Sequence, residues 1–273
     1  MHRPLGGLAR RKALVERLKN QKKSFLSVDS GDLFFGSPVG SPHVKEQWAK
    51  QAKFLVKHLN TLGVQAVGVG ETDFALGLNF LLSLKSQARF SFLSANIIDA
   101  KTEKTLFEPY LITQVQGIKI GIFSILDSSF ALPEGIKILD SVATSQKMVQ
   151  ELSSKVDVII ALTHQGLAKD VELAQKVSGI DIMIGGHDKQ HLDQPTQIKN
   201  TLILESGDQG KYVGLLNLFW KKGAHFSSEM ETYVLDQANL SQIDTKLDQL
   251  RALPKDDLVT RQEQELLKQK WDL

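Results

Sequence analysis

Four segments of the chain share one arrangement, in which a short apolar run leads directly into a glycine-containing turn that carries an acidic residue or a histidine. The carboxyl ends of parallel strands meet at one edge of a sheet, and ligands bind there. Glycine lets the backbone turn sharply and brings the next side chain to that edge. Carboxylate oxygens and imidazole nitrogens that converge from several strand ends predict a divalent-cation site. The four turns are residues 29–32, 70–73, 163–166 and 185–188.

The rest of the chain alternates between helical and strand patterns, which predicts an α/β fold whose sheets are largely parallel and buried on both faces. The pattern predicts helices over residues 8–19, 44–62, 78–85, 141–155 and 169–177. It predicts strands over residues 24–28, 65–69, 92–95, 110–115, 119–125, 157–162, 180–184, 201–205 and 212–220. Gln116-Gly117 indicates a hairpin between two of these strands. In helix 44–62, the spacing places Phe54, Leu55, His58 and Leu62 on one side.

The amino-acid composition of the chain excludes several kinds of partner and site. The chain of 273 residues is 42% hydrophobic and carries a formal net charge of +2, so it can bury a core and shows no charge bias toward nucleic acid or a membrane surface. It has no cysteine, which excludes disulfides, thiolate metal sites and a cysteine nucleophile. Any metal is then held by His, Asp, Glu, Asn or Gln, a donor set that suits Zn, Mn, Fe, Mg or Ca. No apolar run approaches the ~20 residues of a membrane span, and the first residues lack the apolar core of a signal peptide.

Each turn taken alone is a weak signal. A histidine at the end of a buried strand, such as His164, is more often a hydrogen-bonded core residue than a metal ligand. Asp32 by itself has a common alternative role in turns and at helix N-termini. The order of the motifs is far more specific, because several stretches resemble the metallophosphatase domain of the 5′-nucleotidase and UDP-sugar hydrolase family, within the calcineurin-like phosphoesterases. These stretches are residues 6–11, 28–38, 93–97, 157–164, 179–187 and 205–212.

The resemblance implies a four-layer αββα sandwich, the calcineurin-like metallophosphoesterase fold, with two metal ions over one edge. It implies that Asp32 bridges both metals and that His164 and His187 bind one of them. It also implies hydrolysis of a nucleotide or a similar phosphate ester by metal-activated water, with Asp32 and His164 as catalytic residues. Relatives with this arrangement are mostly exported, so the resemblance implies a periplasmic or extracytoplasmic location.

The chain departs from the family pattern around the turn at residues 70–73. Glu71 stands where the family has a metal-binding asparagine, and a carboxylate can take that role. Thr72 replaces the family's catalytic histidine and cannot act as a cation. Loss of a preorganised donor of this kind costs about 10²–10³ in rate.

Two further departures concern the second of the two metal ions, the one that His164 and His187 do not bind. The family has an Asp-x-His pair upstream of the segment that corresponds to residues 6–11. This chain has only His2 there, which we interpret as a loop residue. Either the chain is truncated or this branch of the family lacks the pair. Lys189 stands at a ligand position, and its ammonium group either occupies the space of the missing metal beside Asp32 or points to solvent. The remaining donors, Asp32, Glu71, His164 and His187, suffice for one metal, so the expected state is one or two divalent ions, or none.

The prediction for the domains is a metallophosphoesterase domain over residues 1–238 and a helical C-terminal tail over residues 239–273 that offers a site for a partner. From the resemblance we expect this chain to lack the family's second, substrate-binding domain, because residues after 240 are too few to form it. Asn96 follows a strand and either lines the substrate cleft or hydrogen-bonds within the core. Three interpretations of function stay open: a metal-dependent phosphoesterase acting on a small phosphate ester, a non-catalytic pseudoenzyme that binds a ligand, and a structural domain of an exported assembly.

Overall fold

The computed structural model describes residues 6–21, 23–36, 42–219 and 227–234. The chain divides into two compact units. The larger unit is Leu18–Glu205, and the smaller unit combines residues from the two ends of the chain.

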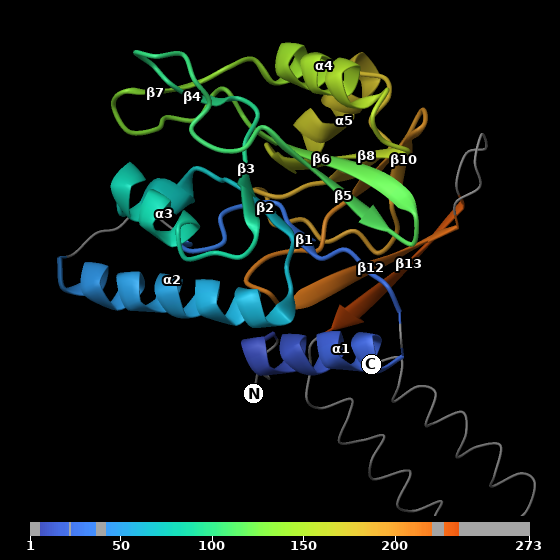
Figure 1. Cartoon of the computed structure of the whole chain (residues 1–273), viewed down its shortest axis with the longest axis horizontal. Coiled ribbons are helices and arrows are strands. Elements are labelled where there is room, and N and C mark those ends of the chain that lie inside the picture. Colours follow the sequence, from blue (N-terminus) through green and yellow to red (C-terminus); the bar gives the residue numbers. More distant parts are fainter. Residues whose placement is uncertain (1–5, 22, 37–41, 220–226, 235–273) are drawn as a thin grey trace, which may run out of the picture. The chain divides into compact units, whose positions relative to one another are not determined.

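The larger unit contains two main sheets (Figure 1). One has three parallel strands in the order β1 (Val28–Asp29), β2 (Ala66–Gly68) and β3 (Ser91–Leu93). The other has six strands in the order β10-β11-β9-β8-β6-β5, of which the inner pairs are parallel and the two edge pairs, β5–β6 and β10–β11, are antiparallel. Its strands are β5 (Tyr110–Val115), β6 (Ile118–Leu126), β8 (Val158–His164), β9 (Ile182–Ile184), β10 (Thr196–Ile198) and β11 (Thr201–Leu204).

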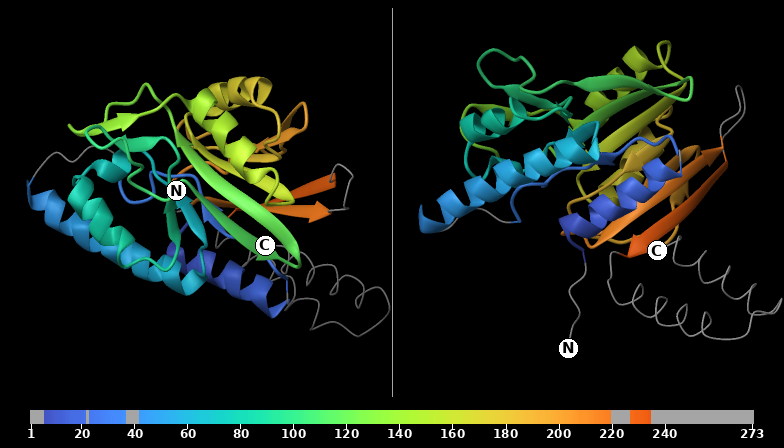
Figure 2. Two further views of the ribbon diagram at one scale, coloured as in Figure 1. Left: turned by 45° about the horizontal axis from the view of Figure 1, so that its top comes forward. Right: turned by 60° about the horizontal axis from the view of Figure 1, so that its bottom comes forward.

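Helices cover the outer sides of the two sheets, which gives the four αββα layers (Figures 1 and 2). The sheets face each other, because β2 contacts both β6 and β8. Helix α4 (Ser141–Leu152) packs on β6, and α5 (Leu167–Lys176) packs on β10 and β11. Helices α2 (Pro42–Leu62) and α3 (Leu78–Lys85) lie along the three-stranded sheet. A short 3-10 helix, η1 (Thr72–Phe74), follows β2, and β4 (Ile97–Asp99) pairs with β7 (Ile136–Ile138). The predicted fold class is thus confirmed.

One apolar core lies between the six-stranded sheet and helices α4 and α5. All seven residues of β8 are buried, as expected for a central parallel strand with both faces covered. Phe123 of β6, Leu152 of α4 and Met183 of β9 have no exposed surface and belong to one apolar cluster. This packing holds β8 rigid up to its last residue, His164.

The smaller unit includes the first part of helix α1 (Leu8–Asn20) and a two-stranded antiparallel sheet. Its strands, β12 (Tyr212–Phe219) and β13 (Ser227–Val234), pair from Tyr212 opposite Val234 to Phe219 opposite Ser227. The predicted helical tail, residues 239–273, lies outside the described residues, so the domain boundaries stay a prediction. Among the helices that the structure describes, none combines the length and apolar character that a bilayer crossing requires.

The strand and helix predictions agree closely with the structure where the pattern is long. The first strand is shorter than predicted, β1 instead of residues 24–28. Just before it, the N–H of Ser27 donates to the side chain of Gln65 (2.7 Å), while the carbonyl of Ser27 accepts the backbone N–H of Gln65 (2.9 Å). The prediction missed β4, β7 and β10, each three residues long and too short to show a period of two. It also missed β13.

The predicted apolar side of helix α2 is wrong in one respect. Phe54 is 61% exposed, whereas Val56 and Leu59 are buried. With Ala52 and Leu62 they form the buried stripe, at the spacing of one helix face. Phe54 and His58 instead stack on each other, with ring centroids 6.4 Å apart.

We expect replacement of Leu59 by alanine to lower the free energy of unfolding by about 2–5 kcal/mol, because the side chain is fully buried and its removal leaves a cavity. Phe54→Ala, on the same helix, should cost less than about 0.5 kcal/mol. Urea unfolding followed by circular dichroism measures both. Equal losses for the two variants would contradict the assignment of the buried face.

Candidate metal centre

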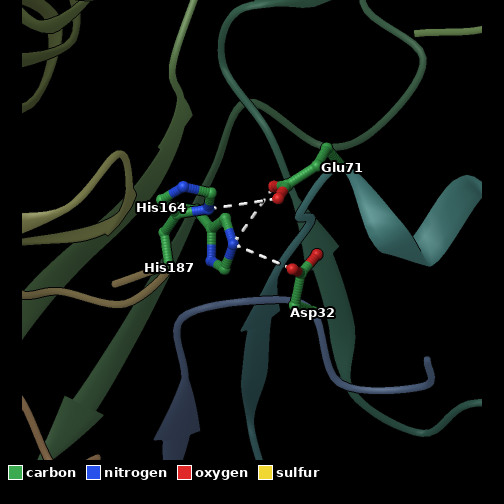
Figure 3. A group of neighbouring side chains, drawn as sticks. All are labelled: Asp32, Glu71, His164 and His187. Atoms are coloured by element: carbon green, nitrogen blue, oxygen red, sulfur yellow. Dashed lines mark ion pairs between the residues drawn. The ribbon is translucent and has the colours of Figure 1, made fainter. Parts of the chain in front are cut away.

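Four side chains meet at the carboxyl ends of strands from both main sheets (Figure 3). Asp32 follows β1, Glu71 follows β2, His164 ends β8 and His187 follows β9. Each of them offers one ligand atom, and these four atoms lie within 4.8 Å of one another. The structure therefore brings together all four residues that the sequence named as metal ligands.

The contacts within the cluster link each imidazole to a carboxylate. Nε2 of His164 lies 3.2 Å from Oδ2 of Asp32 and 3.2 Å from Oε2 of Glu71. Nδ1 of His187 lies 3.1 Å from the other oxygen of Glu71. The two imidazole rings meet edge to face, with centroids 5.4 Å apart. Two imidazoles and two carboxylates thus turn toward one another, as Figure 3 shows.

The hydrogen bonds of His164 determine which of its nitrogens faces the cluster. Nδ1 lies 3.1 Å from the carbonyl oxygen of Ser30, which can only accept, so Nδ1 carries the proton and donates. Nε2 is left for the cluster. This Nε2 and Oε2 of Glu71 are both buried, and although they lie 3.2 Å apart, neither makes a hydrogen bond. A histidine that ligates a metal typically donates its other N–H to a backbone carbonyl in this way. The donor set and the two unsatisfied atoms therefore fit a bound cation.

A buried carboxylate below the cluster, that of Asp73, holds two of the turns together. Its Oδ2 accepts the N–H of Gly70 (2.9 Å) and of Asp32 (3.1 Å), and its Oδ1 accepts the N–H of Phe34 (3.1 Å). Asp32 has a φ of 52°, a left-handed conformation that is uncommon outside glycine and that these bonds stabilise. Asp73 therefore positions the backbone of the ligand turns and is not itself one of the four donors.

Glycines let these turns approach one another closely. A Cβ atom at Gly31 would lie 2.9 Å from the backbone nitrogen of Gly70 and 3.1 Å from Nδ1 of His164. A Cβ atom at Gly186 would lie 2.7 Å from Oγ of Ser30, which donates to the carbonyl of Gly185 (2.9 Å). The glycine requirement inferred from the sequence has this steric cause.

Two further carboxylates, that of buried Asp170 and that of exposed Asp188, support the two histidine turns. Asp170 of α5 accepts hydrogen bonds from Thr163 (2.8 Å) and Gln165 (2.9 Å), the residues on either side of His164. Asp188, next to His187, accepts the N–H of Leu167 (2.9 Å) at the start of α5. Helix α5 thereby anchors the residues that flank both imidazoles.

Electrostatics at the cluster favour a positive charge between the carboxylates. Burial alone would lower the pKa of His164, but its contacts with Asp32 and Glu71 outweigh burial and raise this pKa well above its ordinary value. Burial would raise the pKa of Asp32, yet the contact with His164 and the N–H of Thr72 lower it. Burial and the charge of Asp32 raise the pKa of Asp73 to about 7. A proton on His164 thus fills the electrostatic role of a cation, and metal binding would displace it.

Three other residues singled out from the sequence lie in different settings. Asn96 is fully buried and bonds to backbone, donating to the carbonyls of Leu126 (2.6 Å) and Leu139 (3.1 Å), which is the core role left open as its alternative. Lys189 is exposed and forms no ion pair with Asp32, as its solvent-pointing alternative implies. Thr72 donates its hydroxyl to the carbonyl of Phe35 (2.5 Å). His2 lies outside the described residues.

Several supporting residues were missed by reasoning from the sequence. Asp73 had been grouped with the ligand-bearing turns, and no role was predicted for Ser30, Asp170 or Phe130. The one available signal was an aspartate on the apolar side of α5, where burial of Asp170 requires hydrogen-bonding partners. The other contacts join segments that are far apart in the chain and leave no local pattern.

The chain is similar in sequence to bacterial nucleotide phosphoesterases. It is 31% identical over 208 residues to a 2′,3′-cyclic-nucleotide 2′-phosphodiesterase/3′-nucleotidase from Salmonella typhimurium, an alignment that covers 66% of this chain and 32% of that protein. It is 30% identical over 275 residues to a 5′-nucleotidase from Vibrio cholerae, covering 86% of this chain and 48% of that protein. The chain thus spans half or less of the length of these relatives. No protein-family model matches the chain.

Solved structures agree with these relatives. A 5′-nucleotidase precursor from Thermus thermophilus superposes with a TM-score of 0.76 at 26% identity and covers 98% of this chain and 54% of that chain. A calcineurin-like phosphoesterase from Bacillus subtilis, at 22% identity, shares the fold with a TM-score of 0.70 and covers 100% of this chain and 91% of that chain. The family resemblance and the fold that it implies are confirmed.

Asp170 should make the stability of the protein depend on pH. Burial raises the pKa of Asp170 from 3.8 to about 7, so the folded state keeps the proton over a range in which the unfolded state has lost it. The stabilising contribution is fully present below pH 3.8 and is lost as the pH rises toward about 7, by up to about 1.4 kcal/mol per pH unit.

Urea unfolding at a series of pH values checks this. Asp170→Asn mimics the neutral acid, and we expect it to remove that part of the pH dependence. The difference in free energy of unfolding between wild type and variant should therefore change between pH 3.8 and about 7. A constant difference at every pH would contradict a raised pKa for Asp170.

Proposed function

We propose that this chain, a member of the calcineurin-like phosphoesterases related to 5′-nucleotidases, forms the metal-dependent part of an enzyme that hydrolyses the phosphate ester of a nucleotide. The observation that carries the proposal is the convergence of four donor atoms within 4.8 Å, two of them buried without a hydrogen-bond partner. The names of the relatives favour hydrolysis over the non-catalytic alternative.

Asp32, Glu71, His164 and His187 would hold a divalent cation, and two imidazoles with two carboxylates suit Zn, Mn or Fe. Such an ion acts as a Lewis acid toward phosphoryl oxygens and lowers the pKa of water. Asp32 and His164 serve catalysis as ligands whose orientation is fixed by the N–H of Thr72 (2.8 Å) and the carbonyl of Ser30 (3.1 Å). Thr72 provides no cationic donor for the phosphate, because its side chain is uncharged, and its hydroxyl donates to the carbonyl of Phe35 instead.

The geometry of Asp32 supports a single ion at this cluster. Oδ2 of Asp32 faces His164, while Oδ1 accepts the N–H of Thr72 at 2.8 Å. One carboxylate oxygen is therefore directed to a cation and the other to the backbone. Within the part of the chain that the structure describes, the four residues form the one metal-type group, and Lys189 adds no donor to it.

Asp32→Ala should abolish metal-dependent hydrolysis. We expect metal affinity to fall by more than the roughly 10–100-fold that loss of a supporting residue costs, because Asp32 is itself a ligand. The measurements are release of phosphate from nucleoside monophosphates and from a cyclic nucleotide with Mn²⁺ or Zn²⁺, with and without a chelator. Asp193→Ala, which removes an aspartate whose side chain is 92% exposed, is the matched control and should keep full activity.

Turnover by Asp32→Ala equal to that of the control would contradict this role. Failure of the metal-loaded wild-type protein to hydrolyse any of these esters would overturn the proposed function.

The metal content should be one ion per chain. After saturation with Mn²⁺ and removal of free ion, elemental analysis should give about one Mn²⁺ per protein, and the electron paramagnetic resonance spectrum should lack the spin coupling of an ion pair. Glu71→Gln should reduce the bound amount. Two ions per chain, or a coupled spectrum, would contradict a single-ion site.

An extracytoplasmic location also stays our proposal. It is supported by the resemblance to a mostly exported family, and cell fractionation with an antibody against the protein tests it.

A further inference from the structure

A short turn at the end of β6, residues 127–130, lies against both histidines of the cluster. The backbone N–H of Asp127 donates to the carbonyl of His164 (3.2 Å). Three residues later, the ring of Phe130 packs on the imidazole of His187, with centroids 4.5 Å apart and the planes tilted by 43°. One turn therefore contacts the backbone of one imidazole ligand and the side chain of the other.

The turn is held in place by several bonds. The N–H groups of Ser129 and Phe130 donate to Asp127, to its Oδ1 (3.0 Å) and to its carbonyl (3.2 Å). Lys169 of α5 forms an ion pair with the carboxylate of Asp127 and donates to Oγ of Ser129 (3.2 Å). Phe130 is thus presented to His187 by a turn anchored at both β8 and α5.

His187 needs external support more than the other ligands do. Its φ is 92°, a conformation that a residue with a Cβ atom rarely adopts and that persists only where surrounding contacts impose it. Its side chain is 34% exposed, against 2% for His164, so burial does not fix its rotamer. The contacts that restrain its ring are the carboxylate of Glu71 and the rings of His164 and Phe130.

We propose that Phe130 is a positioning residue, which holds the imidazole of His187 in the orientation in which it can bind metal together with Glu71 and His164. The proposal rests on the metal site of the proposed function. The physical basis is preorganisation: a ring that is already restrained loses less rotational freedom when it becomes a ligand. The apolar ring also excludes water from one side of His187, which strengthens its electrostatic contact with Glu71.

The test is the affinity for Mn²⁺ or Zn²⁺ of the whole chain, measured by competition with a fluorescent chelator. We expect Phe130→Ala to weaken metal binding about 10-fold, the lower end of the effect of residues that support ligands. Phe130→Tyr keeps the ring and should stay near wild type, and Phe130→Leu should fall between them. Phe54→Ala removes an exposed phenylalanine from α2 and should leave the affinity unchanged.

A purely structural role for Phe130 has a different signature. It would lower the thermal midpoint of the metal-free protein without changing the metal dissociation constant, and that result overturns the proposal. A positioning role also predicts that Phe130→Ala alters the visible spectrum of bound Co²⁺, and that it costs little further affinity once His187 is alanine. Equal and additive losses in the presence and absence of His187 would overturn it. Phe130→Leu keeps the test available if the alanine variant does not fold.

The His187→Ala variant distinguishes failure of the positioning role of Phe130 from failure of the proposed metal site itself. If His187→Ala binds metal as tightly as wild type, the proposed metal site itself fails. If His187→Ala weakens binding while Phe130→Ala does not, the metal site stands and the positioning role of Phe130 is wrong.

Discussion

The candidate site depends on one buried carboxylate, that of Asp73, which accepts three backbone N–H groups from two different turns. These N–H groups would otherwise be left without partners at the end of a sheet, at a cost of about 1–3 kcal/mol each when buried. By holding the turns after β1 and β2 together, Asp73 places Asp32 and Glu71 on the same side of the cluster. The raised pKa of Asp73 is a consequence of burial next to another carboxylate.

The second half of the site is built on the opposite sheet by the same principle. Asp170 bonds to the residues on both sides of His164, and Asp188 bonds to the start of α5. Each ligand pair is therefore oriented by acids that do not belong to the cluster: buried Asp73 for one pair, and buried Asp170 with exposed Asp188 for the other. Ser30 joins the halves, since its carbonyl accepts from His164 and its hydroxyl donates to Gly185. Rigid support of this kind is what a metal site needs in order to keep its donors close before an ion arrives.

Local patterns allowed the α/β class and the four glycine turns to be predicted, whereas the four-layer sandwich and the choice of one donor in each turn followed from the family resemblance. An apolar run that ends in a glycine turn marks a strand end, and four such ends, two from each main sheet, converge. The side of α2 that is buried was not predictable in the same way, since Phe54 is as apolar as its neighbours and only the position of the sheet decides which face is covered. The roles of Asp73 and Phe130 were likewise invisible, because their partners are set by the approach of distant turns. Asn96 is the opposite case, a residue whose sequence position allows a role that the structure does not show. It follows a strand and could line a substrate cleft, but its amide donates to backbone carbonyls in the core.

Charge balance connects the departures from the family pattern with one another. In the family pattern an asparagine and a bridging aspartate serve two ions, whereas here Glu71 adds a second carboxylate beside Asp32. Two carboxylates and one divalent cation form a neutral group, which is the least costly charge state for a partly buried site. Without a cation the same carboxylates raise the pKa of His164, which then carries a positive charge in the cluster. The substitution of glutamate for asparagine and the engagement of Oδ1 of Asp32 by the backbone thus both support our proposal of a single ion at this cluster.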